Sequence, residues 1–312
     1  MALMDAVRLL GGLGFFLFGM RTMSEGLEKA AGVRLKPILQ AVTRGRFSGM
    51  LTGAAVTAAI QSSSATTVMT IGFVQAGMMT LRQAASIIMG ANIGTTATAL
   101  MLSAKIDFSA VFAAGGLLLM FMPARRPGWR SLGNVMIGLA VLFTGMDVMS
   151  GAVRPLRELP AFREAMASVG HPLAGIAVGT AVTAVLQSSS AGIGILQALA
   201  GEGLITLSGA QYIIFGQNIG TCVTAMLACM GASYGAKRAA VIHLFFNIIG
   251  TVLMTAISLL FPLGEWIGML TPDSVRLQIA LMHLTFNLVT TAVLLPASDM
   301  LVWLSCKIIR GE

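Results

Sequence analysis

The string QSSSATT at residues 61–67 lies between two apolar stretches, and QSSSAGI at residues 187–193 lies in the same setting. Each is followed at the same distance by a second polar string, GANIGTT at 90–96 and GQNIGTC at 216–222. Hydroxyl and amide groups inside apolar sequence are costly to bury unless they are hydrogen-bonded. We therefore expect the rest of the chain to enclose these four strings.

The four strings belong to an internal duplication with a constant offset of 126 residues. The offset holds without a gap from Gly12 and Gly138 to Thr98 and Thr224. Matches at one fixed spacing over so many glycine and polar positions indicate a true repeat. The partner of the first apolar segment is internal to the chain, so both are expected to be permanent transmembrane helices and not a cleaved signal peptide.

The composition indicates a membrane protein. Of the 312 residues, 56% are hydrophobic and only 10% are charged, whereas soluble domains carry about 25% charged residues. The net charge of +8 comes from Lys and Arg that flank apolar segments, which indicates membrane orientation and not nucleic-acid binding. The three cysteines have neither the number nor the spacing of a disulfide framework or metal site.

We predict an all-α integral membrane protein with two inverted-topology repeats, each containing a re-entrant helical hairpin and a discontinuous helix. The apolar arms beside each QSSS string have about 14 residues, too few to cross a bilayer. The first repeat covers residues 1–131, with a span at 6–24, a basic surface segment at 25–46, a hairpin at 47–79, and spans at 84–103 and 108–122. The second covers residues 132–312, with a span at 132–151, a surface segment at 154–169, a hairpin at 171–203, a span at 209–230, and two extra C-terminal spans at 237–261 and 277–296.

The count of spans predicts that the repeats face opposite ways. Three spans separate the start of the first copy from the start of the second, and an odd number reverses direction. Inverted repeats are typical of secondary transporters that bind substrate at the membrane midplane. With the N-terminus outside, 14 of the 20 Lys and Arg residues fall inside, so N-out and C-in is the expected orientation.

The serines of each QSSS string suit an oxyanion. Serine is a preferred N-cap, and the helix that it caps has free N–H groups and partial positive charge at its start. Two such helix starts, brought together by inversion, would supply many donors to a tetrahedral anion without a buried Lys or Arg.

The Gly-x-Asn-Ile-Gly-Thr strings suit a cation. Two glycines four residues apart allow a helix to unwind and expose its carbonyl oxygens, while Asn and Thr add side-chain oxygens, and hard cations such as Na⁺ take oxygen ligands. An alternative is that these small residues form a helix-packing face. The symmetric duplication favours a binding site.

Two further features have open alternatives. The segments His243–Asn247 and His283–Asn287 each place His four residues before Asn, which allows hydrogen bonds between helices or a proton-linked role. Arg21 and Asp147 occupy equivalent positions in the repeat. Charges inside membranes mark function or pair with one another, although Arg21 can also extend to the membrane interface.

At these motifs the sequence resembles the sodium–phosphate cotransporter family, which includes the animal type II carriers and many bacterial members. The resemblance implies a symporter in a bacterial plasma (inner) membrane, with Na⁺-coupled uptake of inorganic phosphate by alternating access. It implies Na⁺ as the coupling ion, no cofactor, no enzymatic activity, lipid and not nucleic acid as surroundings, and a homodimer as a candidate assembly. Many bacterial members carry a C-terminal regulatory domain, and control through it is not expected here.

The resemblance also implies roles for individual residues. The residues expected to contact phosphate are Ser62, Ser63, Ser64, Ser188, Ser189 and Ser190. The residues expected to order the tips or to bind Na⁺ are Gln61, Gln187, Asn92, Thr95, Thr96, Asn218 and Thr221. Cys222 stands where the first repeat has Thr96, so the two halves are not equivalent. Lys105 and Asp107 lie near the place where electrogenic members have an acidic residue, which leaves the stoichiometry open.

Other functions remain as alternatives. Within transport, the substrate could be another oxyanion such as sulfate, or the direction could be export. An intramembrane hydrolase would need a base near a tip serine, and no His, Lys or acidic residue lies near either tip in sequence. A non-transporting scaffold is the remaining alternative.

Overall fold

The computed structural model describes residues 2–31, 45–104, 109–121, 127–155, 159, 164 and 169–311. These residues form thirteen helices and no strand, which confirms the all-α class. The helices are α1 (Ala2–Ala31), α3 (Arg46–Ile60), α4 (Ser63–Gln75), α5 (Leu81–Ser103), α6 (Ser109–Phe121), α7 (Pro127–Val153), α9 (Pro172–Leu186), α10 (Ser189–Gly201), α11 (Leu207–Ala228), α12 (Tyr234–Leu260), α13 (Leu263–Leu270), α14 (Val275–Leu294) and α15 (Ser298–Ile308).

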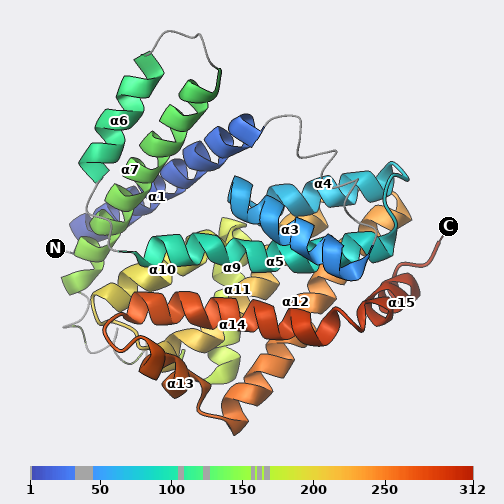
Figure 1. The fold of residues 1–312 in the computed structure, drawn as a ribbon. Helices are drawn as coiled ribbons and strands as arrows, with labels where there is room; N and C mark the ends of the chain where they lie inside the picture. Colours follow the sequence, from blue (N-terminus) through green and yellow to red (C-terminus); the bar gives the residue numbers. More distant parts are fainter. Residues whose placement is uncertain are drawn as a thin grey trace.

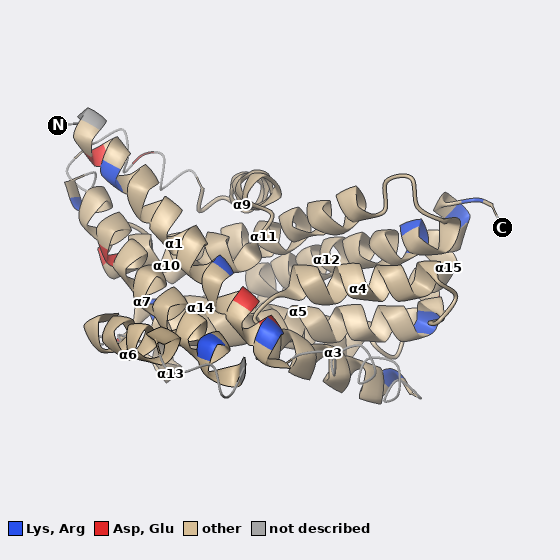
Figure 2. Ribbon diagram, turned by 90° about the horizontal axis from the view of Figure 1, so that it is seen from above, with Lys and Arg blue, Asp and Glu red and all other residues tan. Residues whose placement is uncertain are grey.

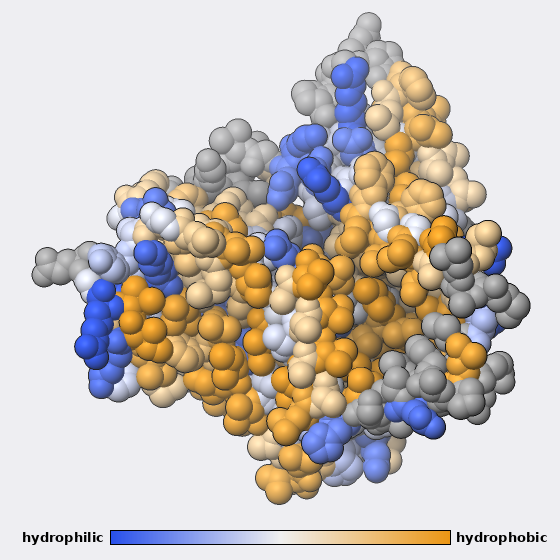
Figure 3. All heavy atoms as spheres, turned by 180° about the vertical axis from the view of Figure 1, so that it is seen from behind, coloured by the Kyte–Doolittle hydropathy of each residue, from blue (hydrophilic) through white to orange (hydrophobic). Residues whose placement is uncertain are grey.

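Five of the described helices are long and apolar enough to cross a membrane, which confirms the integral membrane class. They are Met4–Ala31, Leu81–Ser103, Gly128–Val153, Tyr234–Leu260 and Val275–Leu294. Long stretches of α4, α5 and α12 carry no charged residue (Figure 2). Apolar side chains cover much of the face seen from behind (Figure 3), as expected for a surface in contact with lipid.

The duplicated sequence produces duplicated local structure. The bounds of α9 and α10 lie 126 residues beyond those of α3 and α4. Gln61 and Gln187, which end α3 and α9, adopt the left-handed conformation with φ of 56° and 54°. Gly77 and Gly203 share a φ of 69° after the second helix of each pair. A non-glycine residue rarely adopts positive φ, so its occurrence at both glutamines indicates that both helix breaks are imposed by their surroundings.

Helices α1 and α7 pack through paired glycines, side by side with α6 (Figure 1). A Cβ atom at Gly12 would meet the carbonyl oxygen of Gly145, and one at Gly19 would meet that of Gly138. Side chains would therefore separate these two helices, whose close approach is typical of small residues in membrane interfaces. Because Gly12 faces Gly145 while Gly19 faces Gly138, α1 and α7 run antiparallel.

The prediction of a discontinuous helix in each repeat is wrong. Helices α5 and α11 run unbroken through the two Gly-x-Asn-Ile-Gly-Thr strings. A Cβ atom at Gly90 would overlap the carbonyl oxygen of Met50 in α3, and one at Gly216 would overlap that of Ile176 in α9. These glycines therefore provide close helix packing, the alternative considered above, and do not unwind their helices.

Several other elements differ from expectation. The expected span 108–122 contains α6, which has only 13 residues and is too short to be one of the five candidate spans. The expected span 209–230 corresponds to α11, which has 22 residues but also falls outside those five. Residues 25–31 continue α1 and do not begin a separate surface segment. Helices α13 and α15 were not expected.

Parts of the prediction fall outside the described residues. These parts are residues 32–44 of the first basic segment, most of 154–169, the pair Lys105 and Asp107, and the basic residues Arg125 and Arg126.

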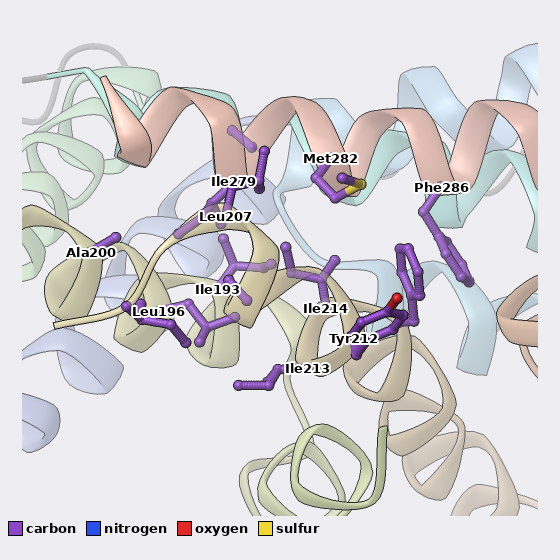
Figure 4. Packing of buried hydrophobic residues seen from close by; sticks show 14 of the residues in the cluster. Ile193, Leu196, Ala200, Leu207, Tyr212, Ile213, Ile214, Ile279, Met282 and Phe286 are labelled. Carbon is purple, nitrogen blue, oxygen red and sulfur yellow. The ribbon is translucent and has the colours of Figure 1, made fainter. Parts of the chain in front are cut away.

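The largest apolar core lies between α10, α11 and α14. Side chains from the three helices meet there, among them Ile193, Ile214 and Met282 (Figure 4). Phe215 of α11 stacks on Phe286 of α14 with ring centroids 5.4 Å apart. This core holds α10 against its neighbours, and so positions the second QSSS string at the start of α10.

Candidate functional site

The first QSSS string forms a sharp break between α3 and α4. Gln61 ends α3 in the left-handed conformation, and Ser62 is extended with φ of −145°. The Ser62 hydroxyl accepts a hydrogen bond from the backbone N–H of Ala65 at 3.2 Å. This confirms that a tip serine caps the helix that follows, with Ser63 and Ser64 as its first residues.

The second string repeats this geometry in a more enclosed setting. Ser188 caps α10 and accepts from the backbone N–H of Ala191 at 3.2 Å. Ser189 and Ser190 are buried, whereas Ser63 and Ser64 are half-buried. The two halves are therefore similar in backbone and unequal in surroundings, in line with the sequence differences between them.

Both strings line one cavity of about 310 Å³, a volume within the range of small-molecule sites. Its lining comprises Leu17, Met20, Arg21, Ser24, Glu25, Glu28, Gln61, Ser62, Ser63, Ser64, Gln187, Ser188, Ser189 and Ser190. The structure thus brings all six predicted serines and both glutamines together, although they lie in two copies of the repeat.

The cavity is rich in hydrogen-bond donors. The first N–H groups of a helix have no partner within the helix. The cap serines accept hydrogen bonds from the N–H groups of Ala65 and Ala191. The backbone N–H groups of the first two serines of α4 and of α10 therefore remain available. Both helices also direct the positive end of their dipole toward the tips. This combination is suited to binding an anion.

Gln61 makes three hydrogen bonds at the first tip. Its side-chain oxygen accepts a hydrogen bond from the Thr98 hydroxyl at 2.8 Å, and its amide nitrogen donates to the Ala58 carbonyl at 2.6 Å. Its backbone carbonyl accepts from Ser24 at 3.4 Å. At the second tip, Thr224 donates to the Gln187 carbonyl at 3.3 Å. The two threonines are repeat partners, and this was the sequence signal that could have identified them as tip-ordering residues.

The polar residues of the first Asn-Ile-Gly-Thr string lie outside the cavity lining. Asn92 donates to the Ile88 carbonyl at 2.8 Å, and Thr95 donates to the Ala91 carbonyl at 3.0 Å. Thr96 donates to the Ile93 carbonyl at 2.7 Å. All three are buried and bond to their own helix, so the structure does not bring them to the tips.

The second string differs because its side chains also form hydrogen bonds with α12 and α14. Asn218 and Thr221 also bond to carbonyls of their own helix, at 2.8 and 2.9 Å. In addition, Asn287 donates to the Asn218 side-chain oxygen at 3.4 Å, and Asn247 donates to the sulfur of Cys222 at 3.3 Å. These contacts place both His-x-x-Phe-Asn strings in hydrogen bonds between helices, as one of the two alternatives expected.

The two histidines of the C-terminal spans do not reach the tips. His243 and His283 are buried in α12 and α14, and no histidine is among the described residues that line the cavity. Among the described residues there is also no group of three or more His, Cys, Asp and Glu side chains that could hold a metal ion.

Charged residues from α1 form part of the cavity wall. Arg21, Glu25 and Glu28 all line it, and the Arg21 Nε atom lies 2.8 Å from Glu25 Oε1. Arg21 was expected to be either an intramembrane charge or an interfacial one, and neither it nor the two glutamates was predicted at the tips. Their positions, one helical turn apart along one face, were the available signal.

The sequence can be compared with known proteins. It is 33% identical over 287 residues to YqeW of Bacillus subtilis (strain 168), covering 92% of each chain. It is 26% identical over 311 residues to YjbB of Escherichia coli (strain K12), whose name proposes inorganic phosphate export; the match covers 99% of this chain and 57% of YjbB. Sodium-dependent phosphate transport protein 2C of Mus musculus is 36% identical over 124 residues, which are 38% of this chain and 21% of that protein. No solved structure matches the chain significantly.

The model of one family, described as Na⁺/Pi-cotransporter, matches residues 15–151 and 160–271. The matched residues include both QSSS strings and both Gly-x-Asn-Ile-Gly-Thr strings, and they make up most of the chain. The chain therefore belongs to the Na⁺/Pi-cotransporter family, whose members are transporters and not enzymes.

Proposed function

We propose that the protein couples the movement of inorganic phosphate to that of Na⁺ by alternating access, with phosphate bound between Gln61–Ser64 and Gln187–Ser190. The observation that carries this proposal is the single cavity lined by both QSSS strings. The family supplies the substrate class.

Phosphate matches the chemistry of the cavity. It is a tetrahedral oxyanion, and its four oxygens need donors in three dimensions. Six serine hydroxyls and the first N–H groups of α4 and α10 would supply them, with two helix dipoles favouring the negative charge. Oriented dipoles of this kind offset the cost of taking the anion out of water.

We further propose that residues 1–131 and 132–312 form inverted repeats. When each residue is replaced by its partner in the other repeat, the contact of Gly12 with Gly145 becomes that of Gly138 with Gly19, which is also present. Such an exchange is typical of a two-fold axis, and the antiparallel course of α1 and α7 favours an axis in the membrane plane. In this arrangement the helix pairs at 47–79 and 171–203 would be re-entrant hairpins, and the orientation would be N-out and C-in.

Na⁺ would be held by the neutral oxygens of amide and hydroxyl side chains, since hard cations take oxygen ligands. The candidates remain Gln61, Gln187, Asn92, Thr95, Thr96, Asn218 and Thr221. Asn92 and the threonines donate a hydrogen to a carbonyl, which leaves their own oxygens able to accept a cation.

Uptake of radiolabelled phosphate into proteoliposomes tests the proposal. We expect uptake above background with an inward Na⁺ gradient and none with an equal K⁺ gradient. The double variant Ser63→Ala with Ser189→Ala should lose uptake, because each substitution removes a hydroxyl from one tip. Folded wild-type protein without Na⁺-dependent uptake would contradict the proposal.

Export of phosphate is a second candidate, favoured by the match to YjbB over 99% of this chain. Proteoliposomes loaded with phosphate and given an outward Na⁺ gradient would show it as Na⁺-dependent efflux. Competition by unlabelled sulfate in the same assay distinguishes phosphate from other tetrahedral oxyanions.

A further inference from the structure

Three charged residues of α1 face the cavity that the QSSS strings line. Arg21, Glu25 and Glu28 are spaced so that they share one side of the helix. Arg21 Nε and Glu25 Oε1 form an ion pair at 2.8 Å, with 81% and 47% of the two side chains exposed. An ion pair this exposed contributes little to stability, so its position at the cavity suggests another role.

The pair leaves Arg21 with unused binding capacity. Its Nε atom bonds to Glu25, while the two terminal nitrogens have no hydrogen bond to any described residue. A guanidinium group presents its donors in a fork that matches two oxygens of a phosphate. Arg21 is also the one Lys or Arg among the described residues that line the cavity.

The two carboxylates work against an entering anion. Two glutamates and one arginine give the charged part of the wall a net negative charge, and like charges repel. Phosphate would therefore gain most from Arg21 if the guanidinium turned away from Glu25 toward the anion. Both partners lie on a wide cavity with exposed side chains, so such a change needs only a rotation of the side chain.

We infer that Arg21 is a phosphate-contacting residue that exchanges partners: it pairs with Glu25 in the empty cavity and with phosphate in the occupied one. Glu25 then sets the phosphate affinity by competing for the guanidinium. This inference rests on the proposed function, and it adds a contact outside the QSSS strings together with a residue that limits affinity.

Kinetics in proteoliposomes test the exchange. Arg21→Gln should raise the KM for phosphate about tenfold or more with a smaller change in maximal rate, because it removes a charge-assisted hydrogen bond to the substrate. Arg21→Lys should give an intermediate KM, since a lysine keeps the charge but loses the fork. Glu25→Gln should lower the KM several-fold by releasing Arg21.

The double variant Arg21→Gln with Glu25→Gln separates exchange from a general effect of charge. If Glu25 acts through Arg21, the double variant should have the KM of Arg21→Gln alone. If both residues act only through the electrostatic field of their charges, Glu25→Gln should lower the KM by the same factor in the wild type and in Arg21→Gln. This result would overturn the exchange.

Two matched controls use the same helix. Glu28→Gln removes an equal charge from the cavity wall without breaking the ion pair, and should lower the KM less than Glu25→Gln. Arg8→Gln removes a positive charge of α1 that does not line the cavity, and should leave the KM unchanged. Equal effects of Glu25→Gln and Glu28→Gln would again argue against the exchange.

Failure of this inference and failure of the proposed function are distinguishable. Na⁺-dependent uptake with an unchanged KM in Arg21→Gln would overturn the role of Arg21 and keep phosphate transport. Equilibrium binding of radiolabelled phosphate to purified protein adds a readout independent of transport. Binding that depends on Arg21 without any uptake would overturn transport and support the contact, whereas no binding by folded wild-type protein would overturn both.

Discussion

At the scale of single residues, a side-chain hydrogen bond joins the first tip to a neighbouring helix. Gln61 adopts a backbone conformation that non-glycine residues rarely take, and Thr98 of α5 donates to its side-chain oxygen at 2.8 Å. Thr98 is only 1% exposed. Removing its hydroxyl would therefore leave the Gln61 side-chain oxygen without this donor.

We predict that Thr98→Val weakens phosphate transport and lowers the melting temperature, because a hydrogen bond of this kind contributes about 0.5–1.5 kcal/mol. Thr98→Ser keeps the hydroxyl and should retain most of both. Uptake kinetics and thermal unfolding in detergent measure the two effects. A Thr98→Val protein that matches the wild type would show that the tip holds its shape without this bond.

At the scale of elements, the fold depends on backbone contact between helices. Gly90 of α5 lies so close to α3 that a Cβ atom would overlap the carbonyl oxygen of Met50. At Gly72 in α4, by contrast, a Cβ atom would meet nothing within 4 Å. The same Gly→Ala substitution can therefore be compared at one helical position without room for a Cβ atom and at another with room for it.

We predict that Gly90→Ala destabilises the protein by about 1–3 kcal/mol or more, because overpacking forces α3 and α5 apart. Gly72→Ala should be neutral or slightly stabilising, since alanine favours a helix over glycine by about 1 kcal/mol. Thermal unfolding and the yield of folded protein compare the two. Equal stability of the variants would mean that α3 and α5 pack less closely than described.

At the scale of the whole molecule, the two repeats surround the tips unequally. The end of α1 lines the cavity through Arg21, Ser24 and the two glutamates. On α7 the repeat partner of Ser24 is Ser150, which is buried and accepts a hydrogen bond from Arg276 at 3.4 Å. Near it, Arg154 and Glu202 form an ion pair at 2.8 Å, which raises the pKa of the Arg154 guanidinium. Ser24 is therefore half-buried on the cavity, whereas its repeat partner Ser150 is buried.

Alternating access predicts that this inequality can reverse. In a background without the native Cys306, we expect Ser24→Cys to react with a water-soluble thiol reagent and Ser150→Cys to be protected in the state described. Conditions that favour the opposite state, tested by varying Na⁺ and phosphate, should increase labelling at Ser150→Cys and decrease it at Ser24→Cys. Labelling of the two positions that always changes in parallel would contradict alternating access between the repeats.

The sequence alone determined the features that depend on local chemistry. The duplication, the all-α membrane class, and the capping of α4 and α10 by Ser62 and Ser188 follow from apolar composition, repeat spacing and the preference of serine for helix starts. The short arms on either side of each QSSS string were also predictable, because each polar string interrupts an apolar stretch at the same position of the repeat. Gln61 and Gln187, which end α3 and α9 in the left-handed conformation, confirm the two breaks.

Only the tertiary structure decided what depends on neighbours. A pair of glycines such as Gly90 and Gly94 permits either an unwound helix or a close helix contact, and the approach of α3 selected the contact. Likewise, Arg21 and Glu25 are simply charges one helical turn apart until the packing of α1 against α3 and α10 places them on the cavity that both tips line. Pairing across distant segments is set by the packing of whole helices, which local sequence patterns do not specify.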